Sequence, residues 1–322
     1  MNKELIANMF LDALKEKVPN RAELTNILVD LLYIEKESVY RRLRGEVGFS
    51  FPEVALIANH FGMSLDNIVS NTVSSKSRPF QLKLVDYDNP SEKDYMMMQE
   101  FLSILWEITT LSQSTILESS NLIPFGIYAK YDCLSRFYLM KWMYQSGDTS
   151  GLKKMENVAY PSKVSRLMRD HWEGLKHIKS TYYILDPLVF EYLVTDIKYF
   201  HDISILSDKD VACLKKDILG VLRDLEVLAT LGAYPDTGNK VSLYVSCINF
   251  DTNYWHIESK KYNISLIKVF VLNNMATLDP NVLTRMKRRL DSLRRSSTLI
   301  SVSGERERIE FFEKQRAIVS AL

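Results

Sequence analysis

The residues most capable of chemistry in this chain are histidines that stand near acidic side chains. His201 directly precedes Asp202, and His256 stands two positions before Glu258. Imidazole nitrogens and carboxylate oxygens are common zinc ligands, but a zinc site needs three or four protein or water ligands held together. Each pair supplies only two, so we expect solvated polar residues here and no metal or other cofactor.

A further histidine begins a possible catalytic motif. His177 and Lys179 match the start of the H-x-K-x4-D motif of phospholipase D-like enzymes. That motif requires an aspartate where this chain has Ile184, and Asp186 comes two positions too late. The chain also lacks G-x-S-x-G, Walker and G-x-G-x-x-G motifs. Because no nucleophile, base and anion donor converge, we expect a protein that is not an enzyme.

Basic side chains crowd one segment near residue 290, with Asp291 as the one acid among them. A basic helix can meet phosphates, an anionic effector or an acidic protein surface. We favour a solvated face beside Glu305, Glu307 and Glu310, and keep an anion or partner site as the alternative. The basic residues are Arg285, Lys287, Arg288, Arg289, Arg294 and Arg295.

Length and charge limit the possible classes of protein. With 322 residues the chain exceeds the usual span of one hydrophobic core, which predicts two or three domains. Its 46% hydrophobic and 25% charged residues are typical of a soluble globular protein. The net charge is +1, and the first 80 residues hold ten basic and ten acidic residues. A nucleic-acid role must therefore rest on where the charges lie.

Membrane and disulfide signals are weak. No stretch approaches the ~20 apolar residues that cross a bilayer, and the first residues lack the apolar core of a signal peptide. Cys133, Cys213 and Cys247 are scattered, odd in number and outside any C-x-x-C pair. We expect buried free thiols in a reducing compartment. The prediction is a cytoplasmic protein without membrane contact.

Five short helices are predicted in the first seventy residues, where apolar residues recur with helical spacing. Asn20 and Glu23 form a capping pair before the second helix, and Ser50 and Glu53 form a capping box before the fourth. Ser64 caps the fifth. Isolated helices below ~12 to 15 residues are marginal in water, so these must share one core.

The third of these helices has the fewest apolar residues. Residues 36–44 place only Val39 and Leu43 on the inner side, and Gly45, which tolerates positive φ, ends the helix. A short break at Tyr33-Ile34 separates it from the second helix. So short a connection predicts a sharp crossing of the two helices, as in a helix-turn-helix.

The order of these features resembles the lambda-repressor and Cro family of helix-turn-helix proteins. The chain has the family's elements in the family's order: an apolar helix, a tight turn, a recognition helix that ends near Gly45, a further helix and the closing segment FGMSLD at residues 61–66. The resemblance covers about fifty residues within LTNILVDLLYIEKESVYRRLRGEVGFSFPEVALIANHFGMSLDNIV. It implies a transcriptional regulator of the bacterial type that binds double-stranded DNA.

The resemblance also implies which residues meet DNA. Its recognition helix starts near Glu35 or Lys36 and lies in the major groove. Arginine binds guanine bidentately and serine hydrogen-bonds to bases, whereas Arg42 and Arg44 are alternatively phosphate contacts that fix the register. The implied DNA-binding residues are Lys36, Glu37, Ser38, Tyr40, Arg41, Arg42 and Arg44.

Two features depart from the family pattern. Tyr33 occupies the turn position where the family usually has glycine, and Glu35 and Glu37 bring negative charge toward phosphates. These carboxylates also stabilise the first turn of a helix through its dipole. The alternatives to DNA binding are a solvated basic face and a helix-turn-helix scaffold that is used for protein contacts.

The remainder of the chain is predicted to form a second, mixed part. Residues 1–72 are predicted to form the DNA-binding domain. A linker with several serines follows at residues 73–92, and residues 93–322 form a mainly helical region that leads into an α/β part. Helices are expected at residues 92–119, 128–144, 162–180, 187–200, 208–230, 281–295 and 305–321. Strands are expected at residues 80–85, 181–185, 240–248, 254–258, 264–272 and 298–302.

The sequence thus predicts an α+β multidomain regulator that acts as a homodimer, because two DNA-binding domains read two half-sites. Its C-terminal part senses an unidentified small-molecule or protein effector, or assembles the dimer. The rival functions are a protein-interaction module and, less favoured, an enzyme in the C-terminal part. Neutralising Arg41, Arg42 and Arg44 is expected to abolish DNA binding, which separates the regulator from these rivals.

Overall fold

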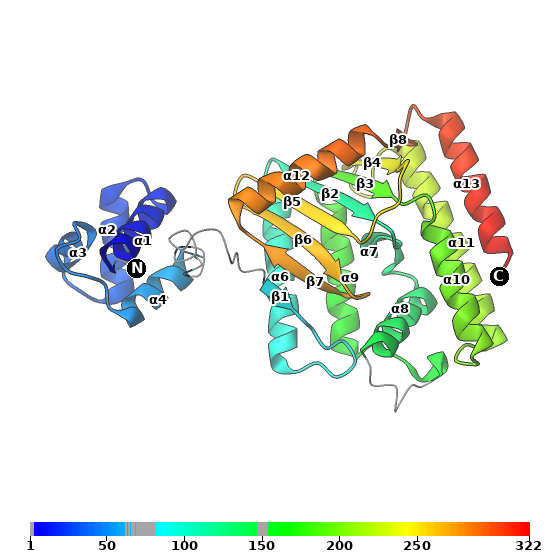
Figure 1. Ribbon diagram of the computed structural model, residues 1–322, viewed down its shortest axis with the longest axis horizontal. Helices are drawn as coiled ribbons and strands as arrows, with labels where there is room; N and C mark the ends of the chain where they lie inside the picture. Colours follow the sequence, from blue (N-terminus) through cyan, green and yellow to red (C-terminus); the bar gives the residue numbers. More distant parts are fainter. Residues whose placement is uncertain (1–2, 62, 64, 66–67, 69–80, 147–153) are drawn as a thin grey trace. The chain divides into compact units, whose positions relative to one another are not determined.

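The chain folds into two compact units, Met1–Phe80 and Gln81–Leu322, which we call the head and the body. The computed structural model describes residues 3–61, 63, 65, 68, 81–146 and 154–322 (Figure 1). Residues 81–92, expected in the linker, are grouped with the body. Residues 73–80 of the predicted linker lie outside the described residues.

The head is all-α throughout its described residues, as predicted. Its helices are α1 (Lys3–Lys17), α2 (Arg21–Leu32), α3 (Lys36–Leu43) and α4 (Phe51–His60). The Asn20 side chain accepts hydrogen bonds from the backbone N–H groups of Ala22 and Glu23 at 3.0 and 3.3 Å. Glu53 accepts from the Ser50 backbone N–H at 2.7 Å. Both predicted caps are therefore confirmed.

The predicted fifth helix is only partly described. Leu65 and Ile68 are helical, whereas Ser64, its expected cap, lies outside the described residues. Gly62 and Asp66 of the closing segment FGMSLD also lie outside the described residues.

The short head helices share one apolar core, as their narrow apolar faces require. Burial of one such aliphatic side chain contributes about 1.5–3 kcal/mol, so no helix of this length is stable without the others. The buried core residues are Phe10, Leu11, Leu14, Leu24, Leu28, Val39, Leu43, Ile57 and Ile68.

A mixed sheet of eight strands organises the described part of the body, in the order β1-β7-β6-β5-β2-β3-β4-β8. β2, β3 and β4 run parallel, and the other neighbours are antiparallel. The strands are β1 (Gln81–Lys83), β2 (Ser114–Ser120), β3 (Ser180–Leu185), β4 (Lys240–Val245), β5 (Tyr254–Ser259), β6 (Asn263–Val269), β7 (Asn273–Thr277) and β8 (Thr298–Leu299).

Helices surround this sheet (Figure 1). They are α6 (Glu92–Thr110), α7 (Phe125–Tyr128), α8 (Asp132–Gln145), α9 (Ser162–Lys176), α10 (Val189–Asp202), α11 (Asp208–Leu231), α12 (Pro280–Arg295) and α13 (Glu305–Ser320). A 3-10 turn covers Met155–Asn157. Among the helices that the structure describes, none is long and apolar enough to cross a bilayer.

The two faces of the sheet are covered differently. Ile116 of β2 packs in one cluster with Leu105 of α6 and Leu175 of α9. The next residue, Leu117, packs with Leu290 of α12. Because successive strand residues point to opposite faces, α6 and α9 lie on one face and α12 lies on the other.

The structure corrects two sequence predictions in the body. Residues 114–119, expected to continue a helix, form most of β2, and residues 264–272 begin a hairpin whose second strand, β7, was not predicted. β2 also joins the sheet between β3 and β5, so the helical middle is part of the same unit as the α/β part.

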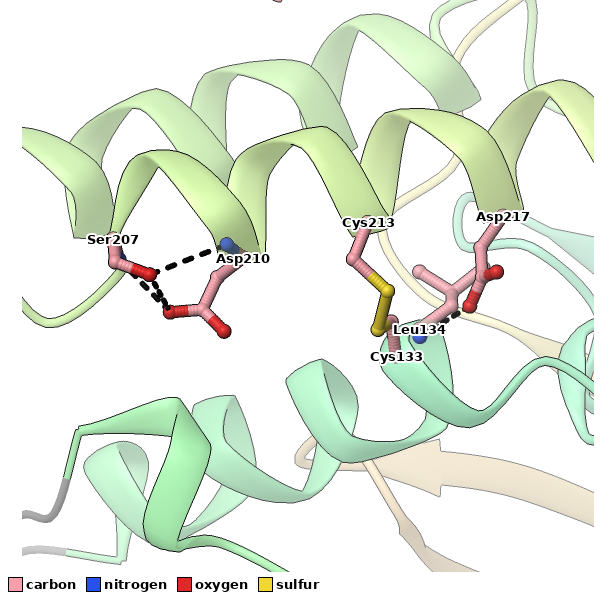
Figure 2. Close-up of a disulfide and its surroundings, with 6 residues drawn as sticks. All are labelled: Cys133, Leu134, Ser207, Asp210, Cys213 and Asp217. Carbon is pink, nitrogen blue, oxygen red and sulfur yellow. Dashed lines mark hydrogen bonds between the residues drawn. A yellow bond between two sulfur atoms is a disulfide. The ribbon is translucent and has the colours of Figure 1, made fainter.

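The prediction that all three cysteines are buried free thiols is wrong. Cys133 at the start of α8 and Cys213 on α11 form a disulfide with a Cα–Cα distance of 6.2 Å, and Cys247 is free and exposed. Figure 2 shows this bond beside Asp217, one turn further along α11, which accepts a hydrogen bond from the backbone N–H of Leu134 at 3.1 Å. The two cysteines are 80 residues apart, so their spacing gave no signal of the pairing.

Candidate nucleic-acid interface

The core of the head fixes the position of α3. α2 ends at Leu32 and α3 begins at Lys36, so three residues connect them. Val39 is fully buried and Leu43 nearly so, in the same cluster as Leu28 of α2. These two apolar residues hold one side of α3 against the head, which leaves its polar side chains on the other side.

The outer side of α3 is exposed and mixed in charge. Lys36, Glu37 and Arg41 are exposed, with the Arg41 side chain 55% accessible. Ser38 and Tyr40 are half-buried. Of the predicted DNA-binding residues, the structure thus brings Lys36, Glu37, Arg41 and Arg44 to the surface of the head.

Arg42 is positioned differently from its neighbour Arg41. Its Nη2 donates to Oε1 of Glu53 on α4 at 3.0 Å, and its side chain is only 19% exposed. Its Nη1 also donates to the carbonyl of Ser38 at 3.4 Å. Arg42 therefore joins α3 to α4, and its guanidinium is largely used within the fold.

The partner of Arg42 is an ionised carboxylate. Burial raises the pKa of Glu53, but hydrogen bonds from Ser50 and the charge of Arg42 outweigh it, so that this pKa lies below its ordinary value. The same carboxylate completes the capping box of α4 through Ser50. One glutamate thereby stabilises both the start of α4 and its contact with α3.

Arg44 lies among glutamates at the end of α3. Its Nε donates to Oε1 of Glu46 at 2.5 Å, and its Nη2 lies 3.3 Å from Oε1 of Glu37. Hydrogen bonds with Glu46 and Glu37 raise the pKa of Arg44, and the bond from Arg44 lowers that of Glu46. Arg41 lies 3.6 Å from the second oxygen of Glu46. Exposed ion pairs of this kind are weak in water, so a phosphate can replace Glu46.

One cation of this surface was missed in the sequence. The guanidinium of Arg21, the first residue of α2, lies 6.0 Å from the ring centre of Tyr40 on α3. Arg21 is exposed, and it directly follows the Asn20 cap. A basic residue at the first position of the preceding helix was the available signal, but it stands fifteen residues before α3 begins.

The histidines that were considered for chemistry have other partners. His201 pairs with Asp208 at 2.9 Å, and Nδ1 of the buried His256 lies 2.9 Å from the Ser265 hydroxyl. Glu258 instead accepts from Lys287 at 2.7 Å. Within the described part of the chain, no three His, Cys, Asp or Glu side chains gather into a possible metal site.

The second predicted cluster of basic residues lies on α12. Lys287 pairs with Glu258, and Arg294 lies 3.1 Å from Asp291 and 4.7 Å from the ring centre of Tyr182. The remaining four arginines of α12 are exposed: Arg285, Arg288, Arg289 and Arg295.

Comparisons with protein-family models, curated proteins and solved structures give no match to this chain. The assignment of a function therefore rests on the residues and geometry of the head itself.

Proposed function

We propose that the protein is a sequence-specific DNA-binding regulator of transcription, and that α2, the three-residue turn and α3 act as its helix-turn-helix. One observation carries the proposal: α3 buries Val39 and Leu43 and presents Lys36, Arg41 and Arg44 on the exposed part of the head. A short helix held by one apolar side, with cations along the other, suits the major groove.

The side chains divide the work of recognition in this proposal. Lys36 and Ser38, in the first turn of α3, face base edges, where both can donate hydrogen bonds. Arg41 and Arg44 exchange Glu46 for phosphates, which fixes the register of the head on the duplex. Arg42, paired with Glu53, positions α3 from within the fold.

We further propose that two copies act together, since two heads read two half-sites related by a two-fold axis. The body would assemble this dimer or bind an effector that changes how the two heads are placed. As a regulator of transcription, the protein would act in the cytoplasm.

A paired substitution tests DNA binding by the head. Fragments are first selected from genomic DNA with the wild-type protein, and affinities for the selected site are then measured. Arg41→Ala with Arg44→Ala should weaken binding roughly 100-fold, because two phosphate contacts are lost. Arg42 is left intact so that α3 stays attached to α4.

The matched control is Lys15→Ala with Lys17→Ala, which removes two exposed cations from α1 of the same head. It should keep most of the affinity. If the wild-type protein selects no DNA, or both double variants bind equally well, the head is not the DNA-binding element.

A second function, protein binding by the head, is favoured by two exposed aromatic side chains. Tyr33 is 93% exposed and Phe51 is 79% exposed, and large exposed aromatic residues often anchor protein interfaces. This alternative predicts that replacing Tyr33 and Phe51 with Ser releases a protein partner while DNA selection by the wild type fails.

A further inference from the structure

The body carries a cationic surface of its own on α12. This helix has six basic residues and one acidic residue, hence a net charge of +5 in a chain whose net charge is +1. Four of its basic residues are exposed, and within the described residues none of these four is part of an ion pair. We call Arg285, Arg288, Arg289 and Arg295 the α12 arginine row.

The inner side of α12 shows that the row is not needed for packing. Leu283 and Leu290 are buried, and Leu290 packs on Leu117 and Ile184 of the sheet. The other two cations of the helix, Lys287 and Arg294, have the partners described above. The fold thus uses the apolar side of α12 and two of its cations, while the arginine row faces solvent.

Acidic residues that follow in the sequence do not neutralise the row. Glu305, Glu307 and Glu310 were expected beside it, but they belong to α13, which packs on α10 and α11. α12 instead packs on β2, β5 and β6. Glu310 accepts a hydrogen bond from Arg306 of its own helix at 2.9 Å.

The arginine row follows one face of α12 and is long enough to meet several phosphates. Residues three, four and seven apart lie on one face of a helix, which holds for Arg285, Arg288, Arg289 and Arg295. From first to last they span about 15 Å at 1.5 Å per residue. Phosphates of one DNA strand follow each other every ~3.4 Å along the duplex axis, so the row matches the length of about five phosphates.

The residue type points to the same ligand. All four unpaired cations are arginines, whose planar guanidinium binds phosphate bidentately and is more weakly hydrated than the lysine ammonium. Arg295 also lies near the end of α12, where a cation stabilises the helix, but Arg285, Arg288 and Arg289 lie in its middle.

We propose that the α12 arginine row binds the phosphate backbone of duplex DNA as a sequence-independent contact of the body. The inference rests on the proposed function of the head, and it adds a second group of phosphate contacts to it. Sequence is read by the head, whereas the row raises the affinity for any duplex.

The test uses the full-length protein and a 40-bp duplex that contains the selected site. The variant Arg285→Gln, Arg288→Gln, Arg289→Gln, Arg295→Gln keeps good helix-forming residues on α12. We expect at least a tenfold loss of affinity near 0.1 M salt. The slope of log K against log salt should become shallower by about 3 to 4, because each lost phosphate contact contributes about 0.9. The preference for the selected site over a scrambled duplex should stay unchanged.

A matched control removes the same four charges elsewhere on the body. Lys198, Lys209, Lys216 and Lys314 are exposed on α10, α11 and α13, and their quadruple Gln variant should bind nearly as the wild type does. If both quadruple variants lose the same affinity, only net charge is at work and the row is not a site.

The remaining outcomes separate the row from the head. If the row variant binds DNA as the wild type does, the row is not a DNA contact, and an acidic protein surface becomes its expected ligand. DNA binding by the head is then still tested separately by the Arg41→Ala, Arg44→Ala variant. If the row variant loses affinity while the Arg41/Arg44 variant binds the selected site as tightly as the wild type does, the row is confirmed and the head proposal fails.

Discussion

Two adjacent arginines of α3 show how the same side chain can serve a ligand or the fold. Arg41 is largely exposed, whereas Arg42 is nearly buried against Glu53, with its Nε buried and without a hydrogen-bond partner. Removing one partner of such a buried pair leaves an uncompensated charge. We therefore expect loss of Arg41 to affect ligand binding and loss of Arg42 to affect the stability of the head.

Arg42→Ala should destabilise the head by about 2–3 kcal/mol, since Glu53 loses its partner in a half-buried position. Arg41→Ala should change stability by less than ~0.5 kcal/mol, as is usual at exposed sites. All four tryptophans lie in the body, so fluorescence does not follow the head. Hydrogen exchange of peptides from α3 and α4 measures the effect, and equal exchange in the two variants would refute a structural role for Arg42.

His171 on α9 is a residue whose surroundings disfavour charge. Its ring packs near Phe101, Phe125 and Trp255, and its Nε2 is buried without a hydrogen-bond partner. Burial lowers the pKa of His171 from 6.5 to about 4. Between these two pH values, His171 is therefore protonated in the unfolded chain and neutral in the folded body.

This shift predicts acid sensitivity of the body. For a histidine whose folded pKa is depressed, stability is full above pH 6.5 and falls as the pH drops toward 4, by up to about 3 kcal/mol. His171→Phe should lack this loss. Urea unfolding, followed by tryptophan fluorescence at pH 7 and pH 4.5, gives the difference between the two proteins. An identical pH dependence in the variant would show that His171 is not responsible.

At the scale of elements, the turn between α2 and α3 is held by an unusual backbone conformation. Tyr33 has φ 52 and ψ 44 in the left-handed region, and its side chain is almost fully exposed. Residues with a side chain pay roughly 1–2 kcal/mol there, which glycine avoids. Tyr33 thus adopts the left-handed backbone conformation that a glycine would take at this turn, although it carries a side chain.

Tyr33→Gly should therefore stabilise the head by about 1 kcal/mol, reduced somewhat by the greater freedom of glycine in the unfolded chain. Tyr33→Ala serves as the control, because it removes the ring but keeps the backbone penalty. Hydrogen exchange of α2 and α3 peptides should slow in the glycine variant alone. Slower exchange in both variants would assign the cost to the exposed ring instead.

Local signals explain which elements were predictable from the sequence. The caps at Asn20 and Ser50, the stop at Gly45 and the amphipathic helices of the head depend on neighbouring residues, and the structure contains them. β2 was missed because it lies between two strands and is buried along nearly its whole length, so its residues show no alternation.

Partners far apart in the chain were not predictable. The Arg42–Glu53 pair and the contact of Arg21 with Tyr40 depend on how helices cross, which spacing does not reveal. The disulfide joins residues 80 positions apart. The α12 arginines were found in the sequence, but their lack of partners required knowing where α13 packs.

The disulfide between α8 and α11 makes the body sensitive to reduction. Closing a loop of 80 residues restricts the unfolded chain, and bonds of this kind typically contribute about 2–4 kcal/mol. Both cysteines are only half-buried, so a reductant can reach the disulfide. Dithiothreitol should lower the unfolding temperature of the wild type but not that of a Cys133→Ser, Cys213→Ser variant. An unfolding temperature unmoved by reductant would show that the bond does not form in solution.

At the scale of the whole molecule, the proposed dimer requires a contact surface, and the described part of the body has exposed apolar side chains that could form one. Leu231 at the end of α11 and Val302 after β8 are 56% and 63% exposed. Val302 lies against the last turn of α11, because its backbone N–H donates to the Ala229 carbonyl at 2.8 Å. Val302 also has φ 53, which is rare for a β-branched residue. Together with the exposed Val227, one turn before Leu231, they form what we call the α11 apolar patch.

If two copies associate through the α11 apolar patch, Leu231→Asp with Val302→Asp should yield monomers, because the charges would be buried without partners. Light scattering after size exclusion gives the mass directly. Ile248→Asp with Leu278→Asp, at two equally exposed apolar positions elsewhere on the body, should stay dimeric. The monomeric variant should also lose affinity for a site with two half-sites while binding a single half-site normally, since each head is intact. A wild type that is monomeric at all concentrations tested would remove both the patch and the paired heads from the proposal.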